Sequence, residues 1–306
     1  MTSILETILP IFLVIFLGCV LSALSRVRES VVEEVNRLVF HVALPAMIFL
    51  GVARVPFRLH FHPVLAAVVL ACTATAFFAG IALARLLRVP GPLAGTFVQC
   101  GFHGNLGYVG LAVAYYHLGE AGFAEAGILA AFLMLLQNVL AVTILSPRAP
   151  AGSGAGSRHR IRKIAGNPVV LAAGAGVLFS LSGLALPPVA GRFLKIVADL
   201  SLPAALLVIG ASLSFSVIRQ NLGLTAWTSV VKLVLLPALG YAVLRGLDLP
   251  PEALQPAIIL LAAPTATLAR VMAGEMGGSG SLASAAISMN TLLSAFTYLF
   301  WLRLVG

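Results

Sequence analysis

The chain has 306 residues, of which 60% are hydrophobic and 9% are charged, and its mean hydropathy is +1.06. Soluble domains carry about 25% charged residues, so this composition excludes an ordinary water-soluble domain and indicates lipid as the solvent. A net charge of +9 would suit nucleic-acid binding in a soluble protein. Here most basic residues fall in short connections between apolar runs, which is typical of topology control, so no nucleic-acid partner is expected.

Ten apolar runs are predicted to cross the membrane, because a span needs about 20 apolar residues. In chain order they cover residues 4–24, 32–53, 63–87, 92–117, 122–145, 167–184, 189–213, 222–245, 253–275 and 280–303. An open sheet cannot satisfy its backbone in lipid, and these runs are too long and too uniformly apolar for barrel strands. The predicted fold class is therefore an all-α polytopic membrane protein with ten transmembrane helices.

The segment SPRAPAGSGAGSRHRIRK at 146–163 has the composition of a flexible linker and carries five basic residues. Its charge predicts a cytoplasmic location. Alternating sides from this loop places eleven basic residues in the cytoplasm and six outside, which predicts an inner-membrane protein with both termini outside. The predicted divisions are a first unit at 1–145, the linker at 146–166 and a second unit at 167–306.

The two halves agree at a constant offset of 158 residues. Four identical pairs share this offset: Pro10 and Pro168, Gly18 and Gly176, Ser22 and Ser180, and Pro45 and Pro203. Each half holds five predicted spans, and five is odd, so the second half must enter the membrane from the opposite side. This predicts a five-plus-five inverted-topology repeat, which favours a secondary transporter that works by alternating access.

Two predicted spans are interrupted near their middle, at GFHGNLGYVG (101–110) and at AAPTAT (262–267). Glycine and proline both weaken a helix, and Leu106 matches Pro264 at the 158-residue offset. Close helix packing through small residues is an alternative explanation of the glycines. Paired interruptions at equivalent depth in the two halves are nevertheless the pattern expected of a transporter site.

The N-termini of half-helices at such a crossing carry partial positive charge and free N–H groups, which favour a carboxylate. A small organic anion is therefore the expected substrate. The candidate binding residues come from both interruptions: His103, Gly104, Asn105, Gly107, Pro264, Thr265 and Thr267. Asn105 would add a donor side chain and the two threonines would add hydroxyls, whereas His103 also fits a packing role.

Several other polar residues lie within predicted spans. Asp199 and His41 share the 158-residue offset and each precedes a proline by four residues, so they are candidates for proton or sodium coupling. A structural role for Asp199 is equally open. Arg270 would either attract an anion or extend to the membrane interface, and Lys232 has no assignable partner. Three amides are expected to bond between helices: Gln137, Asn138 and Asn290.

Four motifs in combination resemble the auxin efflux carrier family over essentially the whole chain: GNLGYVG (104–110), VALPA (42–46), NPVV (167–170) and SLPAALLVIGASL (201–213). The resemblance implies ten spans in a five-plus-five inverted repeat, with a scaffold panel and a transport panel in which the fourth and ninth helices cross. It also implies transport of organic anions, which in bacterial members are dicarboxylates such as malate or malonate.

The resemblance places the family's crossover asparagine on Asn105 and its crossover proline on Pro264. Many members have another asparagine soon after that proline, but here Leu268 and Ala269 follow Thr267. The identity of the substrate is therefore not carried over from the family.

Two alternative functions share features with this sequence. A sodium-coupled symporter of the bile-acid type has a similar architecture, but it would need an oxygen-rich cation cage near the crossing. GGSG at 277–280 resembles the GxSG signature of rhomboid proteases, whose general base is a histidine on a later span. No histidine follows His159, so no enzymatic activity is expected.

The remaining expected partners are few. Membrane lipid surrounds the chain, and a homodimer is compatible with the sequence. Three isolated cysteines lie within apolar runs and form no CxxC pair: Cys19, Cys72 and Cys100. Neither a disulfide framework nor a metal or other cofactor is therefore expected.

Overall fold

The computed structural model describes residues 2–145, 166–247, 249 and 251–306. In these residues the chain is helical and contains no β-strand, which confirms the predicted all-α class. Of the predicted linker, only Gly166 falls within the described residues, where it forms part of a turn.

The first half contains α-helices and two short π-helical segments, which are labelled η. In chain order these are α1 (Thr2–Ala23), α2 (Glu29–Leu38), η1 (Val39–Ala43), α3 (Leu44–Ala53), α4 (Phe57–His60), α5 (Pro63–Leu86), α6 (Gly91–Phe102), η2 (Leu106–Gly110) and α7 (Leu111–Leu145). Helix α5 begins at Pro63. Proline lacks an N–H, but the amides of the first helical turn have no carbonyl partner, so no helical hydrogen bond is lost there.

The second half follows with α9 (Pro168–Ser182), α10 (Pro188–Asp199), α11 (Ser201–Ala211), α12 (Phe215–Gln220), α13 (Leu222–Ser229), η4 (Val230–Leu235), α14 (Leu236–Arg245), α15 (Pro251–Leu261), α16 (Leu268–Glu275) and α17 (Gly280–Val305). Seven helical stretches among the described residues are long and apolar enough to cross a membrane, while α9 and most of α6 are shorter apolar helices. A multi-pass membrane protein is therefore supported, and the count of ten spans stays a prediction.

The longest helical stretch, Leu106–Leu145, has 40 residues. A continuous helix of that length would extend about 60 Å, or twice the thickness of the hydrocarbon core. The backbone leaves the helical conformation at Gly119, where φ is 70° and ψ is −166°. Such a positive φ costs glycine little because it has no Cβ, and it divides the stretch into two shorter helices.

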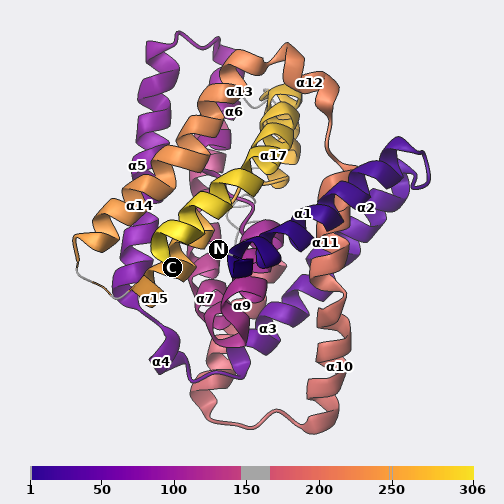
Figure 1. The fold of residues 1–306 in the computed structure, drawn as a ribbon, viewed down its shortest axis with the longest axis vertical. Helices are drawn as coiled ribbons and strands as arrows, with labels where there is room; N and C mark the ends of the chain where they lie inside the picture. Colours follow the sequence, from indigo (N-terminus) through magenta and orange to yellow (C-terminus); the bar gives the residue numbers. More distant parts are fainter. Residues whose placement is uncertain (1, 146–165, 248, 250) are drawn as a thin grey trace.

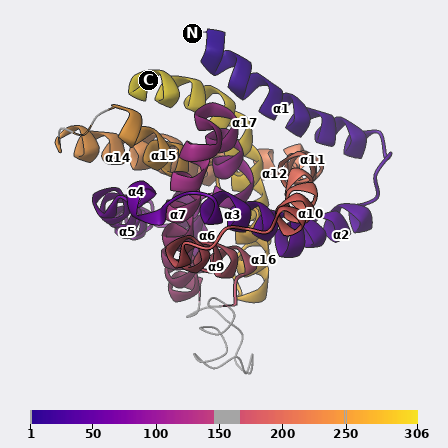
Figure 2. The same cartoon turned by 90° about the horizontal axis from the view of Figure 1, so that it is seen from below.

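The helices form two groups of neighbours, which meet directly where α1 contacts α17 (Figure 1). One group contains α1, α2, α3, α9, α10 and α11, and the other contains α5, α6, α13, α14, α15, α16 and α17. α7 contacts both groups through α3, α9, α5 and α15. The two chain ends lie next to each other in both views (Figures 1 and 2).

Close approach of main chains holds the first group together. A Cβ at Gly18 of α1 would overlap the carbonyl of Leu207 in α11, and a Cβ at Gly176 of α9 would lie 3.2 Å from the carbonyl oxygen of Phe49 in α3. Without side chains at these positions, helices pack closely enough for dispersion contacts to replace the hydrophobic driving force that lipid does not provide.

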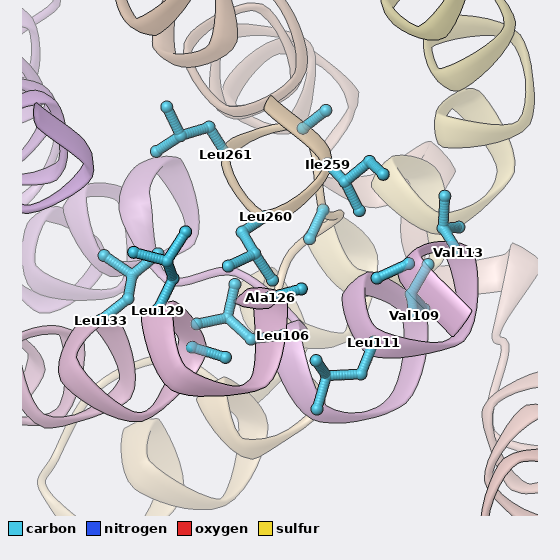
Figure 3. Close-up of a cluster of buried hydrophobic side chains, with 14 of the residues drawn as sticks. Leu106, Val109, Leu111, Val113, Ala126, Leu129, Leu133, Ile259, Leu260 and Leu261 are labelled. Carbon is cyan, nitrogen blue, oxygen red and sulfur yellow. The ribbon is translucent and has the colours of Figure 1, made fainter. Parts of the chain in front are cut away.

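A cluster of buried apolar side chains surrounds the end of α15 and the start of the 106–145 stretch. Figure 3 shows Leu260 of α15 next to Leu106 of η2, with Leu129 and Leu133 of α7 beside them. None of these four side chains is more than 3% exposed. This apolar cluster fixes the position of the non-helical backbone that adjoins α15 and the 106–145 stretch.

Candidate binding site at two crossing helix breaks

The first helix break lies between α6 and η2. The last amide bonded back into α6 is that of His103, which donates to the carbonyl of Gln99 over 2.9 Å. The chain becomes helical again at Leu106, and Asn105 caps this start because its Oδ1 accepts from the Tyr108 amide at 3.3 Å. Asparagine is among the preferred residues for this capping position.

The second helix break lies between α15 and α16. Helix α15 ends at Leu261, and α16 begins at Leu268. Pro264 stands within the six intervening residues, where it can neither donate a backbone hydrogen bond nor continue the helix. The interruptions predicted at 101–110 and 262–267 are thus both places where the helix stops.

The two breaks run side by side and bond to each other. The Asn105 amide donates to the Pro264 carbonyl over 2.6 Å, and the Ala266 amide donates to the His103 carbonyl over 2.8 Å. Gly104 and Thr265 form an isolated antiparallel bridge between these two bonds. Each break therefore satisfies backbone groups that the other has released from its helix, which buried backbone requires.

Gln137 of α7 supports the first break and also lines the cavity beside it. Its Oε1 accepts from the Gly104 amide at 3.2 Å, and its Nε2 donates to the Phe102 carbonyl at 3.2 Å. The sequence suggested only that Gln137 bonds between helices. No local signal connects a side chain to a break more than 30 residues earlier, so its two partners could not be predicted.

Thr265 is fully buried, and its hydroxyl serves the framework of the crossing. The hydroxyl donates to the Cys100 carbonyl at 2.8 Å and accepts from Nδ2 of Asn290 in α17 at 2.6 Å. Asn290 thus bonds between helices, as expected from the sequence. Because its hydroxyl is engaged in this way, Thr265 does not present it to the cavity described next.

A cavity of about 670 Å³ opens beside the crossing. Five of the seven predicted binding residues line it, and these come from both breaks: His103, Gly104, Asn105, Gly107 and Thr267. Pro264 and Thr265 lie behind this lining. The structure therefore brings together most of the residues that the sequence predicts for the site.

Asn105 provides a donor at this cavity. It is 6% exposed, and within the described part of the chain its Nδ2 has no hydrogen-bond partner. A buried N–H without a partner is costly, so this atom is suited to a ligand. Gly107 and Thr267 add the first turns of η2 and α16 to the lining, and such turns have amides without a carbonyl one turn earlier.

Charged residues of α2 also line this cavity. Glu33 and Arg37 do so together with His41 of η1, whose Nδ1 lies 2.9 Å from the Arg37 carbonyl oxygen, and Glu275 of α16 adds a second carboxylate. The cavity therefore combines hydrogen-bond donors at the crossing with the guanidinium of Arg37. Both groups suit an anion.

Asp199 is not brought to this cavity. It is exposed at the end of α10, where its carboxylate accepts from Lys195 Nζ at 2.8 and 3.0 Å. Together with Arg54 and Glu120 this pair lines a separate cavity of about 360 Å³. The structure thus separates Asp199 from His41, and coupling by either residue stays a prediction. Arg270 is exposed on α16 and does not line the crossing cavity.

Lys232, for which the sequence offered no partner, is 0% exposed and lies behind the crossing. Its Nζ donates to the Leu261 carbonyl at 2.7 Å, at the end of α15. Among the described residues, no group of three or more histidines, cysteines or carboxylates is placed to hold a metal ion.

Comparisons with known proteins agree with this architecture. A family model described as "Membrane transport protein" matches residues 3–150 and 157–302. A protein of Rhizobium meliloti (strain 1021) named "Putative malonate transporter" is 28% identical, over 97% of this chain and 94% of its own. An "Uncharacterized transporter" of Methanothermobacter thermautotrophicus is 26% identical, over 97% of this chain and 96% of its own.

Proposed function

The chain belongs to the membrane transport protein family, the auxin efflux carriers that its motifs resemble, and on that basis we propose that it is a secondary carrier of small mono- or dicarboxylates. In this proposal the anion binds where the two helix breaks cross and moves by alternating access. Membership of a transporter family agrees with the expectation that the chain is not an enzyme.

One observation carries the proposal: Asn105 lines a cavity of about 670 Å³, and its buried Nδ2 has no hydrogen-bond partner in the described part of the chain. A carboxylate oxygen accepts hydrogen bonds from such an amide, and the adjoining helix N-termini favour negative charge. The cavity is also large enough for a small organic acid together with water.

Arg37 supports a substrate with a second acidic group. It lines the same cavity as Asn105 but comes from α2, so one carboxylate can bind at the crossing while another pairs with the guanidinium. The name of the Rhizobium meliloti relative, "Putative malonate transporter", points to the same class of substrate for that protein.

Two reciprocal contacts support the inverted repeat. Gly18 approaches the Leu207 carbonyl, and Gly176 approaches the Phe49 carbonyl. The 158-residue offset relates the two contacts, because Gly176 corresponds to Gly18 and Leu207 corresponds to Phe49. Equivalent helices of the two halves therefore pack on each other in equivalent ways, as expected for two copies of one unit.

The helix boundaries support ten spans. The seven long stretches include Leu106–Leu145, and because the turn at Gly119 divides that stretch in two, they account for eight spans. Helix α9 is the ninth span, and the broken pair α15 and α16 is the tenth. The adjacent chain ends in Figures 1 and 2 agree with an even number of spans, and the distribution of basic residues predicts that both ends lie outside the inner membrane.

The arrangement of the two helix groups supports alternating access in this proposal. The crossing belongs to the group that contains α6, α15 and α16, whereas Arg37 belongs to the group that contains α1, α3 and α11. Movement of one group against the other would expose the cavity first on one side of the membrane and then on the other.

Uptake into proteoliposomes tests the proposal. Purified wild-type protein is offered labelled mono- and dicarboxylates, with and without a proton or sodium gradient. Loss of one hydrogen bond to a charged group costs about 1.5–3 kcal/mol, so Asn105→Ala should reduce uptake about 10- to 150-fold. Asn105→Asp keeps an acceptor for the Tyr108 amide but repels an anion, so it should be impaired at least as strongly.

Asn221→Ala is the matched control, because Asn221 bonds to Val217 and Ser281 away from the cavity. It should transport like the wild type. Pro264→Ala should also transport poorly while still inserting into the membrane, since it removes the residue that holds the second break open. Wild-type uptake by both Asn105→Ala and Pro264→Ala would contradict a binding site at the crossing.

A further inference from the structure

Lys232 is a cationic residue in the middle of an apolar span, and it is fully buried. It lies in η4, the π-helical segment within the stretch Leu222–Arg245. A π-helical insertion shifts the direction in which a side chain leaves the helix and is often found at functional sites. The lysine does not line the crossing cavity, so a direct contact with substrate is not its role.

The ammonium lies between the end of α15 and the first helix break. Its Nζ donates to the Leu261 carbonyl at 2.7 Å. A Cβ built on Gly104 would lie 3.3 Å from both Cε and Nζ of Lys232. Gly104 itself lines the cavity, so a single layer of backbone separates the lysine from the space where an anion would bind.

No ion pair balances this positive charge within the described part of the chain. Across the described residues, no carboxylate lies within ion-pair distance of Lys232. An unpaired charge inside a membrane protein is expensive and marks function by default. The C-terminal carbonyl of α15 compensates only part of it, since a helix end carries about half a charge.

We infer that Lys232 is a positioning residue whose ammonium acts through Gly104 as a built-in counter-charge for the transported anion, in the place of a bound sodium ion. This rests on the proposed function. The anion in the cavity supplies the missing negative charge, and the lysine satisfies the Leu261 carbonyl at the end of α15. Anion binding therefore needs no sodium.

Three substitutions separate charge from hydrogen bonding. Lys232→Met removes both, Lys232→Gln removes the charge but keeps a donor for the Leu261 carbonyl, and Lys232→Arg keeps the charge. We expect Lys232→Met and Lys232→Gln to raise the apparent KM for malonate uptake about 10- to 50-fold, as loss of a unit charge a few ångströms from an anion predicts. Lys232→Arg should remain within a few-fold of the wild type.

Lys195→Met is the matched control, because Lys195 is exposed and belongs to the separate cavity with Asp199. Its KM should not change. A second measurement uses the wild type alone: replacing sodium with choline on both sides of the membrane should leave malonate uptake unchanged. This measurement decides the inference even if the uncharged variants do not fold.

Three contrary results would each rule out the proposed role of Lys232. A wild-type KM in Lys232→Gln would show that the lysine only caps the Leu261 carbonyl, and sodium-dependent uptake by the wild type would show that the counter-charge comes from solution; either result overturns the inference. If the wild type takes up no carboxylate at all, the proposed function fails first, and this inference falls with it.

Discussion

Replacing Gln137 with leucine should loosen the first helix break, which Gln137 supports from the wall of the proposed binding cavity. The side chain is 1% exposed and bonds on both sides of the break, to the Gly104 amide and to the Phe102 carbonyl. Leucine has a similar size but neither donor nor acceptor. The substitution therefore removes two buried hydrogen bonds at once and leaves two backbone groups without a partner.

The size of the effect can be bounded from these two bonds. Hydrogen bonds between membrane helices average about 0.6 kcal/mol in double-mutant cycles, which gives a lower bound of roughly 1 kcal/mol for the pair. An orphaned buried group costs about 1–3 kcal/mol, but Gly104 lines the cavity, where water can solvate its amide. We therefore expect a loss of about 1–4 kcal/mol in the free energy of unfolding, or about 2–8 °C in Tm for a chain of this size.

Thermal unfolding in detergent, followed by the fluorescence of Trp227 and Trp301, measures this change. Gln255→Leu is the control, because Gln255 makes one long hydrogen bond of 3.4 Å to the Val305 carbonyl, far from the break. It should lower Tm by less than Gln137→Leu. The uptake rate at a temperature where both proteins are folded should fall only in Gln137→Leu.

The reasoning is refuted if Gln137→Leu unfolds at the wild-type temperature and transports at the wild-type rate. In that case the break would be held by its backbone pairing alone. Gln137→Glu should be at least as destabilising, because an ionised carboxylate is costly at this buried position and cannot donate to the Phe102 carbonyl.

Four other substitutions, of which Gly174→Ala is a control, test the packing and the surface. Gly18→Ala should destabilise the protein and reduce its yield, because the added methyl group overlaps the main chain of α11, whereas Gly174→Ala meets no atom within 4 Å among the described residues and should be tolerated. Tyr298→Phe removes a buried bond of 3.0 Å to a carbonyl of α15 and should cost about 1 kcal/mol in a denaturant titration. Asp199→Asn should change stability by less than about 0.5 kcal/mol because its pair with Lys195 is exposed; an unchanged pH dependence of uptake would remove Asp199 from the coupling hypothesis.

The two helix breaks could be predicted because their signals are local. Glycines before Asn105 and the proline at 264 act on the helix in which they stand, and asparagine is a good cap for the helix that restarts. The constant offset then related the two positions. Side-chain direction was not predictable in the same way, since the hydroxyl of Thr265 bonds to Cys100 and Asn290 instead of facing the cavity.

Contacts between distant segments explain what the sequence could not supply. Lys232 meets Leu261, and Gln137 meets Gly104, only after the helices have packed. Asp199 is different, because Lys195 precedes it by one helical turn and a spacing of four residues predicts an ion pair. Here the pattern was present in the sequence, but the apolar surroundings of Asp199 suggested an intramembrane carboxylate instead.

The bonds that join the two breaks are made by main-chain atoms, since Asn105 and Ala266 contribute amides and Pro264 and His103 contribute carbonyls. Every residue type except proline offers both groups, so mutation can exchange the side chains around this joint while the joint itself persists. Substitutions can therefore change which substrate is accepted while the main-chain bonds between the two breaks persist, in natural variants and in designed ones alike.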